Sequence, residues 1–448
     1  MNSISSIRFM NSRFLGVSYI FLLIACLILS GQKLVPDVGV LSMQIMMVMI
    51  SLFVLSISQK TTRGSLLFII FSAHFIMSVV IRLFYIEHWN DPLGPIPMDA
   101  LDYHMDALKA SRYSLSDFMN FCIEDHDLDD SGFAYILYFI YRMFGNDFGI
   151  HVALLANSVA VTMLCNYTYK IANYYISSEY SKLVIAILGT LSYSVVTSAN
   201  GLKENFFTLF VVGAIYYSIR YYTIKNIGNL LMLILFSALT VLFRLAFLPM
   251  LILAIVSVRF AKYVKLNLRN VFILVLLFGV CIYIGTQLTA YLLAMRGLSE
   301  NVFNDMHAMH YADSNLGGIL SMIANSLFAF VGPIPSFVST ADKISYITMP
   351  NFTVFISILW GSLFIGGFIK AINRRDHVFV ILSTILLNSM MVLMMSFSFN
   401  FRYRYIVFPF IMILTAYGIQ NIEEKELKFH KVYIAGIMTM IFFYNVAF

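Results

Sequence analysis

The chain has 448 residues, of which 60% are hydrophobic, 16% are aromatic and only 12% are charged. An ordinary soluble domain carries about 25% charged residues, so this composition excludes a soluble fold. The formal net charge is +6, from 29 Lys and Arg against 23 Asp and Glu, and we expect no nucleic-acid partner. The mean hydropathy of +0.83 places the chain in a lipid bilayer.

Apolar runs long enough to cross roughly 30 Å of hydrocarbon recur along the chain and predict an all-α, polytopic transmembrane bundle. The first run follows a basic segment but lacks a small-residue cleavage site, so we expect an uncleaved first span. The segment 317–331 is apolar and ends in Gly332-Pro333, which favours an interfacial or re-entrant piece. About 13 spans are predicted, at 15–31, 39–57, 65–85, 147–169, 183–199, 203–221, 228–243, 246–260, 270–293, 351–371, 377–397, 405–421 and 432–447.

Lys and Arg in the short loops set the expected orientation. A cytoplasmic N-terminus places 18 of the 29 basic residues on the cytoplasmic side and puts the C-terminus outside. The two long loops, 86–146 and 294–350, then lie on the outer face. We therefore expect the functional chemistry on that face.

The first outer loop is strongly acidic, with eleven of the 23 acids lying between Tyr85 and Phe133. A solvated hydrophilic loop would also carry such charge. Helical spacing, however, places Asp99, Asp102 and Asp106 on one face, beside Tyr103. Such a face offers carboxylates that act as a general base or hold a divalent cation, Mg²⁺ or Mn²⁺.

The stretch 132–145 is apolar and aromatic but too short to span, so it predicts a helix lying in the membrane interface. A loop roofed by such a helix suits a substrate with a lipid tail and a polar head. In the second outer loop, His307 and His310 share a helical face and offer a weak metal site or contacts to a soluble sugar acceptor.

Several cations are expected at outer span ends, against the usual charge bias. Snorkelling to lipid headgroups explains any one of them. Together they suggest a lipid phosphate or pyrophosphate held on the outer face, since Arg binds phosphate in a bidentate manner. Glu204 would neutralise Lys203 or hold one of the arginines. The cations are Arg82, Arg142, Lys203, Arg244, Arg296, Lys343, Arg402 and Arg404.

These residues resemble bacterial GT-C-type membrane glycosyltransferases. The resemblance rests on four elements between 99 and 204 and on a late Arg-Tyr…Pro element, and it covers roughly 65–260 and 400–420. The five elements are Asp99-x-x-x-Tyr103-His104-x-x-Ala107, the helix Gly132 to Gly145, Leu155-x-Asn157, Gly201-Leu202-Lys203-Glu204, and Arg402-Tyr403-Arg404 through Pro409 to Ala416-Tyr417-Gly418. The resemblance divides the chain into two additional N-terminal helices (1–64), a GT-C-like module (65–260) and a C-terminal transmembrane region (261–448).

The resemblance implies transfer of a sugar from a polyprenyl phosphate or pyrophosphate carrier to a glycan or lipid-linked acceptor, on the periplasmic face of a bacterial inner membrane. Asp99 would be the catalytic base or metal ligand, with Asp102 second. Tyr103, His104, Lys203, Glu204, Arg244, Arg402 and Arg404 would bind substrate. The acidic loop follows the third span here, whereas in the family's usual plan it follows the first, and this brings in the O-antigen and exopolysaccharide polymerases.

A flippase or transporter for a lipid-linked glycan is the rival from a different class. Transporters carry polar residues near the bilayer midplane, within repeated halves. The mid-span regions read as almost purely apolar and show no repeat, so we expect surface chemistry rather than passage. A structural scaffold, in which the outer acids and arginines are dispensable, is a third possibility.

Overall fold

The computed structural model describes residues 12–29, 38–94, 98–126, 131–244, 247–248, 251–252, 254–255, 335, 351–373 and 404–447. Within these residues every regular element is helical, which confirms the all-α fold class. The predicted spans 270–293 and 377–397, the segment 317–331, His307, His310, Arg296, Lys343 and Arg402 lie outside the described residues.

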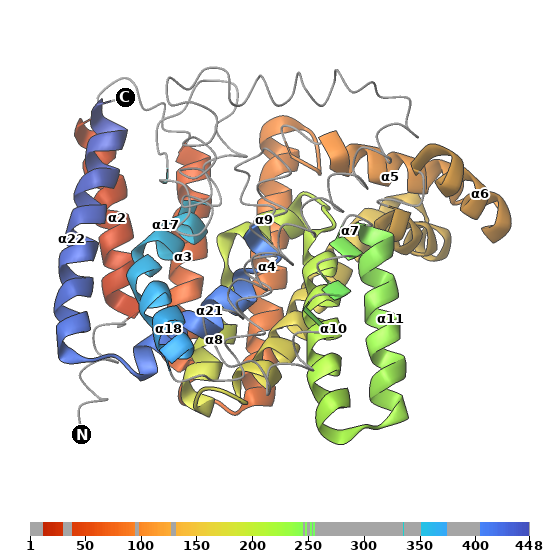
Figure 1. The fold of residues 1–448 in the computed structure, drawn as a ribbon. Helices are drawn as coiled ribbons and strands as arrows, with labels where there is room; N and C mark the ends of the chain where they lie inside the picture. The colour runs from red at the N-terminus through yellow and green to blue at the C-terminus, as the bar shows by residue number, and fades with distance from the viewer. Residues whose placement is uncertain are drawn as a thin grey trace, which may run out of the picture.

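In Figure 1, α2, α3, α4, α10, α11 and α22 stand roughly upright, while α5 and α6 lie across the upper end of the molecule. The helices are α2 (Ser12–Leu29), α3 (Val38–Ser58), α4 (Arg63–Trp89), α5 (Met98–Ala110), α6 (Leu115–His126), α7 (Ser131–Ala172), α8 (Ser178–Thr190), α9 (Ser192–Ala199), α10 (Glu204–Ile224), α11 (Ile227–Phe243), α17 (Asn351–Leu359), α18 (Gly361–Asn373), α21 (Phe408–Gln420) and α22 (Glu424–Ala447).

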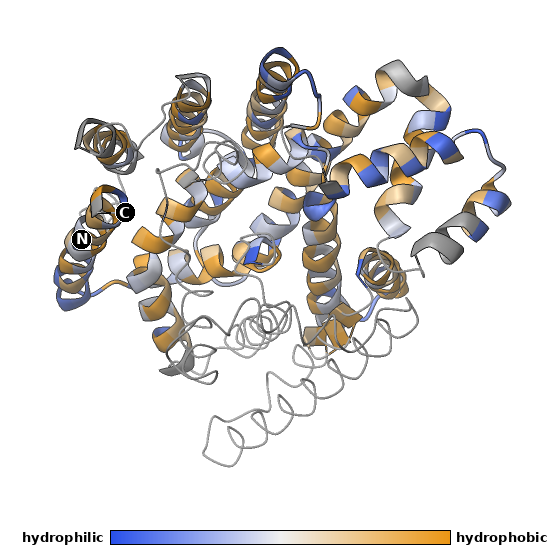
Figure 2. Ribbon diagram, turned by 90° about the horizontal axis from the view of Figure 1, so that it is seen from above, coloured by the Kyte–Doolittle hydropathy of each residue, from blue (hydrophilic) through white to orange (hydrophobic). Residues whose placement is uncertain are grey.

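Five of the described helical segments are long and apolar enough to cross a membrane, and a sixth span results if α17 and α18 count as one. Large apolar side chains are exposed on two of these helices and on the shorter apolar helix α2: Phe53, Phe68 and Phe21 have exposed fractions of 61%, 68% and 67%. Seen from above, hydrophobic residues occupy most turns of the upright helices (Figure 2). The described residues thus form a multi-pass helical membrane protein, and the count of 13 spans stays a prediction.

Two predicted spans are broken. The run 351–371 bends by 49° at Trp360, between α17 and α18. Beside this break the Tyr433 hydroxyl donates to the Ile358 carbonyl at 2.8 Å, which satisfies a carbonyl near the interrupted helix end. The run 183–199 is interrupted at Leu191, between α8 and α9. There the Thr353 hydroxyl of α17 accepts from the Tyr193 amide at 3.0 Å, so a side chain from a distant helix caps the start of α9.

Helix α9 corrects the expectation that the mid-span regions are almost purely apolar. All eight of its residues are buried, and four of them are Ser or Thr. His74 of α4 lies 3.0 Å from the Gly189 carbonyl through Nδ1 and 2.9 Å from the Ser198 hydroxyl through Nε2. Because a carbonyl only accepts, Nδ1 carries the proton and Nε2 accepts from Ser198. The Asn205 amide of α10 donates to the same hydroxyl at 2.8 Å, so the network joins four helices, α4, α8, α9 and α10.

Near the upper end of α4, Arg82 is also buried, with an exposed fraction of 2%. Its guanidinium donates to the carbonyls of Ala199 at 2.8 Å and Ile150 at 2.5 Å. These bonds tie α4 to the end of α9 and to α7. Arg82 is thus a structural residue, and its position needs no phosphate ligand.

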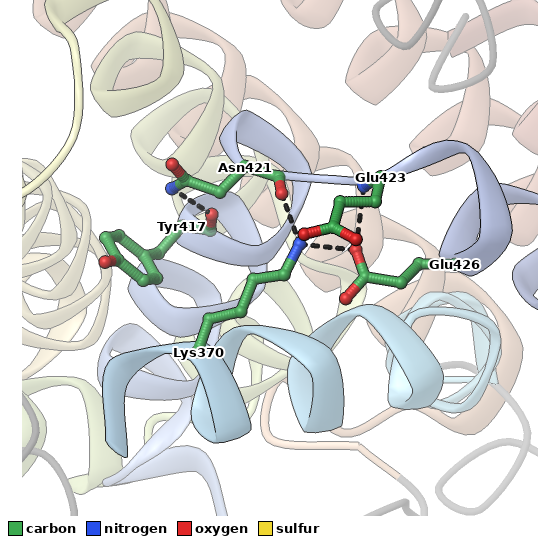
Figure 3. Close-up of polar contacts among 5 residues, drawn as sticks. All are labelled: Lys370, Tyr417, Asn421, Glu423 and Glu426. Carbon is green, nitrogen blue, oxygen red and sulfur yellow. Dashed lines mark hydrogen bonds and ion pairs between the residues drawn. The ribbon is translucent and has the colours of Figure 1, made fainter. Parts of the chain in front are cut away.

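The C-terminal helices pack by close backbone contact. A Cβ on Gly367 of α18 would lie 2.1 Å from the Leu414 carbonyl of α21, and a Cβ on Gly418 would lie 2.3 Å from the Leu363 carbonyl. Small residues at such a crossing let two membrane helices approach closely. Figure 3 shows the adjacent junction, where Lys370 contacts the Glu426 carboxylate and the Asn421 carbonyl, linking α18 to the turn between α21 and α22.

Candidate functional site

Helix α5 carries the predicted acidic face. Its apolar spacing buries Ala100, Tyr103 and Ala107 on one side, which holds the helix against α7. Asp99, in the first turn, is half-buried beside this face, whereas Asp102 is exposed. Of the two predicted catalytic carboxylates, Asp99 therefore lies closer to the protein interior.

The predicted interfacial helix is the first part of α7. The helix is interrupted at Gly145, whose φ of 71° and ψ of −177° suit glycine, and the membrane-spanning segment Phe148–Ala172 begins just after it. Arg142 on the first part donates to the Tyr113 carbonyl at 2.5 Å and lies over the Tyr138 ring at 5.7 Å. Arg142 therefore fixes the turn between α5 and α6, which accounts for this outer cation without a substrate.

Two residues of α5 meet the turn between α9 and α10, about a hundred positions later in the chain. The Lys203 ammonium lies 5.2 Å from the centre of the Tyr103 ring, and Lys203 is buried to an exposed fraction of 2%. The His104 ring lies against Gly201, where an added Cβ would come within 2.5 Å of Nε2. The predicted elements around Asp99 and around Lys203 are thus brought together, with Tyr103 on the buried side of the acidic helix α5 against a buried cation.

A second cation, Arg244, lies near Lys203. It follows the last residue of α11, and its guanidinium carbon lies 5.9 Å from the centre of the Phe207 ring. The Phe207 amide donates to the Lys203 carbonyl at 3.0 Å, so Phe207 stands one helical turn after Lys203. Arg244 and Lys203 therefore both lie at the start of α10, on the end of the bundle that carries α5 (Figure 1).

Two further predicted site residues, Glu204 and Arg404, are also buried. Glu204 is buried in the first turn of α10, and its charge interacts with the Tyr405 phenol just before α21. Arg404 is buried, lies over the Phe408 ring at 6.0 Å and interacts with the Tyr433 phenol of α22. The described geometry connects Arg404 to α21 and α22.

Comparison with known proteins gives no relative from which a function could be inferred. No protein-family model, curated protein or solved structure matches the chain.

Sequence reasoning missed Tyr141 and the role of Gly201. The Tyr141 hydroxyl is joined to His104 Nδ1 by a hydrogen bond of 2.6 Å, which fastens α5 to the first part of α7. The phrase Tyr141-Arg142-Met143-Phe144-Gly145 is visible in the sequence, but nothing in it indicates that its tyrosine reaches back to His104. Among the described residues, no group of three or more His, Cys, Asp or Glu could hold a metal ion.

His104 is electrostatically unusual. Burial, together with the nearby Arg82 charge, lowers the pKa of its imidazole from 6.5 to about 3, and the Gly201 backbone partly opposes this shift. Burial also raises the pKa of the Tyr141 phenol to about 12. His104 is therefore neutral at physiological pH and acts as a hydrogen-bonding link between helices.

This link predicts a loss of stability in mild acid. The unfolded chain binds a proton at this histidine below pH 6.5, whereas the folded chain does so only near pH 3. The stabilisation is therefore complete above pH 6.5 and falls as the pH drops towards 3. Between pH 6.5 and 5.0 we expect the wild type to lose about 2 kcal/mol relative to His104→Asn. Thermal unfolding of the purified proteins at these two pH values measures the difference, and parallel pH slopes would contradict the assignment.

Proposed function

We propose that the protein is a membrane glycosyltransferase of surface-polysaccharide assembly, moving a sugar or oligosaccharide from a polyprenyl phosphate or pyrophosphate carrier to a glycan acceptor on the periplasmic face. One observation carries the proposal: Tyr103 of the acidic helix α5 contacts the buried Lys203 at the start of α10. A carboxylate face beside a cation is what this transfer requires, because a base and a stabiliser of the leaving phosphate must act on the same substrate.

In the proposed reaction, Asp99 removes the proton from an acceptor hydroxyl. The hydroxyl oxygen then attacks the anomeric carbon of the donor, and the bond from that carbon to the carrier phosphate breaks with its electron pair leaving on the phosphate oxygen. Lys203 and Arg244 stabilise the charge on that phosphate through charge-assisted contacts. Asp102, Tyr103, Glu204, Arg402 and Arg404 contribute to substrate binding or to the site's charge, and a divalent cation is an alternative stabiliser.

Two forms of this function differ in what is transferred and to which acceptor. A single-sugar transferase adds one residue or branch, whereas an O-antigen or exopolysaccharide polymerase joins preassembled repeat units. The glycan profile of a deletion strain distinguishes them: loss of chain length with one repeat unit retained indicates a polymerase, and a missing sugar or branch indicates a transferase.

Purified protein in vesicles tests the class itself. With a labelled lipid-linked oligosaccharide as donor and a glycan acceptor, we expect label to move from lipid to acceptor. Label that crosses the bilayer while its glycan stays unchanged would instead establish a flippase. The buried network of His74, Ser198 and Asn205 means that the spans are not purely apolar, so an apolar interior no longer speaks against a transporter. Its hydrogen bonds, however, link α4, α8, α9 and α10 to one another and occupy both ring nitrogens of His74.

A further inference from the structure

A second group of cations lies at the opposite end of the bundle from α5. Arg63 begins α4, Lys170 is near the end of α7, and Arg220 is near the end of α10. This is the lower end in Figure 1, where the α10–α11 hairpin turns. It is the cytoplasmic end in the predicted orientation. Each of the three side chains is half-buried rather than extended into water.

Tyrosine rings lie beside two of these cations. The Lys170 ammonium lies 5.2 Å from the centre of the Tyr167 ring and 5.1 Å from that of Tyr216. The Arg63 guanidinium carbon lies 5.3 Å from the centre of the Tyr169 ring. Cation–π contacts hold Lys170 and Arg63 in place at the ends of α7 and α4, and tyrosine is the residue type enriched at the headgroup level of a membrane.

The three charges repel one another. The Lys170 charge interacts unfavourably with those of Arg63 and Arg220. Arg63 also donates to the Asn166 side-chain oxygen, which is neutral. In the part of the chain that the structure describes, the ion pairs are Lys370–Glu426 and Lys428–Glu424, so a carboxylate neutralises none of these three cations there. The usual cytoplasmic excess of Lys and Arg explains exposed loop charges but not three like charges packed together among aromatic rings.

We propose that Arg63, Lys170 and Arg220 bind the phosphate headgroup of an anionic phospholipid in the leaflet at this end of the bundle. The phosphate relieves the repulsion among the three cations and accepts charge-assisted hydrogen bonds from the two guanidinium groups and the ammonium. The tyrosines set the site at headgroup depth, which selects a lipid over a free phosphate. The proposal is independent of the proposed glycosyl transfer and concerns the other end of the molecule.

Native mass spectrometry of the detergent-purified chain tests the site. Phosphatidylglycerol is titrated against phosphatidylcholine of the same acyl chains, and we expect the wild type to prefer the anionic lipid. The double variant Lys170→Gln/Arg220→Gln should bind phosphatidylglycerol about 10- to 30-fold more weakly. The matched control is Lys60→Gln/Lys225→Gln, which removes two exposed charges near the same end and should change binding less than threefold.

Three results would overturn the proposal. The first is a wild type that binds both lipids equally, a measurement that needs no variant to fold. The second is equal loss of binding in the two double variants, which would make the preference a matter of overall charge. The third is stabilisation by inorganic phosphate alone, measured as a rise in the melting temperature equal to the rise that phosphatidylglycerol causes. That result would identify a free-phosphate site.

Discussion

Asp99→Asn should reduce glycosyl transfer by at least about 100-fold, because a general base contributes roughly 10² to 10⁴ to the rate and an amide cannot accept the proton. Asp99 is half-buried and lies one turn before Tyr103, which contacts Lys203. We therefore infer that Asp99, rather than Asp102, is the catalytic base. The measurement is the transfer rate of purified variants, alongside glycan synthesis in a complemented deletion strain.

Asp102→Asn is the matched comparison, since it makes the same change on the same helix at an exposed position. We expect it to retain activity within about threefold of the wild type, below the contribution of a general base. If both variants keep full glycan synthesis, the catalytic assignment is wrong. A lost activity in Asp102→Asn alone would move the base to that residue.

Gly367→Ala should destabilise the folded protein by about 1–3 kcal/mol, because the new methyl group meets backbone atoms of α21 that no side-chain rotation can move. The two helices must separate to admit it, and the nearby Lys370–Glu426 contact shares the strain. Thermal unfolding in detergent measures the effect, and Gly418→Ala should reproduce it from the other helix.

The neighbouring Gly366 provides the control. A Cβ there meets nothing within 4 Å, and the residue lies in the same helix. Gly366→Ala should therefore leave stability unchanged or raise it by roughly 0.5–1 kcal/mol through the higher helix propensity of alanine. Similar losses in Gly366→Ala and Gly367→Ala would show that the close crossing does not limit stability.

The sequence predicts the helical membrane class and much of the local pattern around α5. Composition and apolar runs suffice for the class, and helical spacing correctly places Tyr103 on the side of α5 next to the acids. The helix before Gly145 is also predictable, and its position in the membrane interface stays a prediction.

The breaks at Leu191 and Trp360 were not predictable, because the side chains beside them, Thr353 and Tyr433, come from distant helices. The same reason hides the link between His104 and Tyr141, which depends on tertiary contact rather than spacing. Topology alone groups Arg82 and Arg142 with Lys203 and Arg244 as outer cations, although the first two bind backbone carbonyls. The fold shows that Arg82 and Arg142 hold helices and turns together through these carbonyls.

The buried polar side chains of α4 constrain how the protein assembles during synthesis. His74 and Arg82 find their partners at Gly189, Ser198 and Ala199, more than a hundred residues later in the chain. When α4 enters the bilayer those partners have not yet been made, and burying unsatisfied polar groups in hydrocarbon is costly. We therefore expect helix α4 to reach its final depth only after α9 is synthesised, which would couple membrane insertion to tertiary packing in this region.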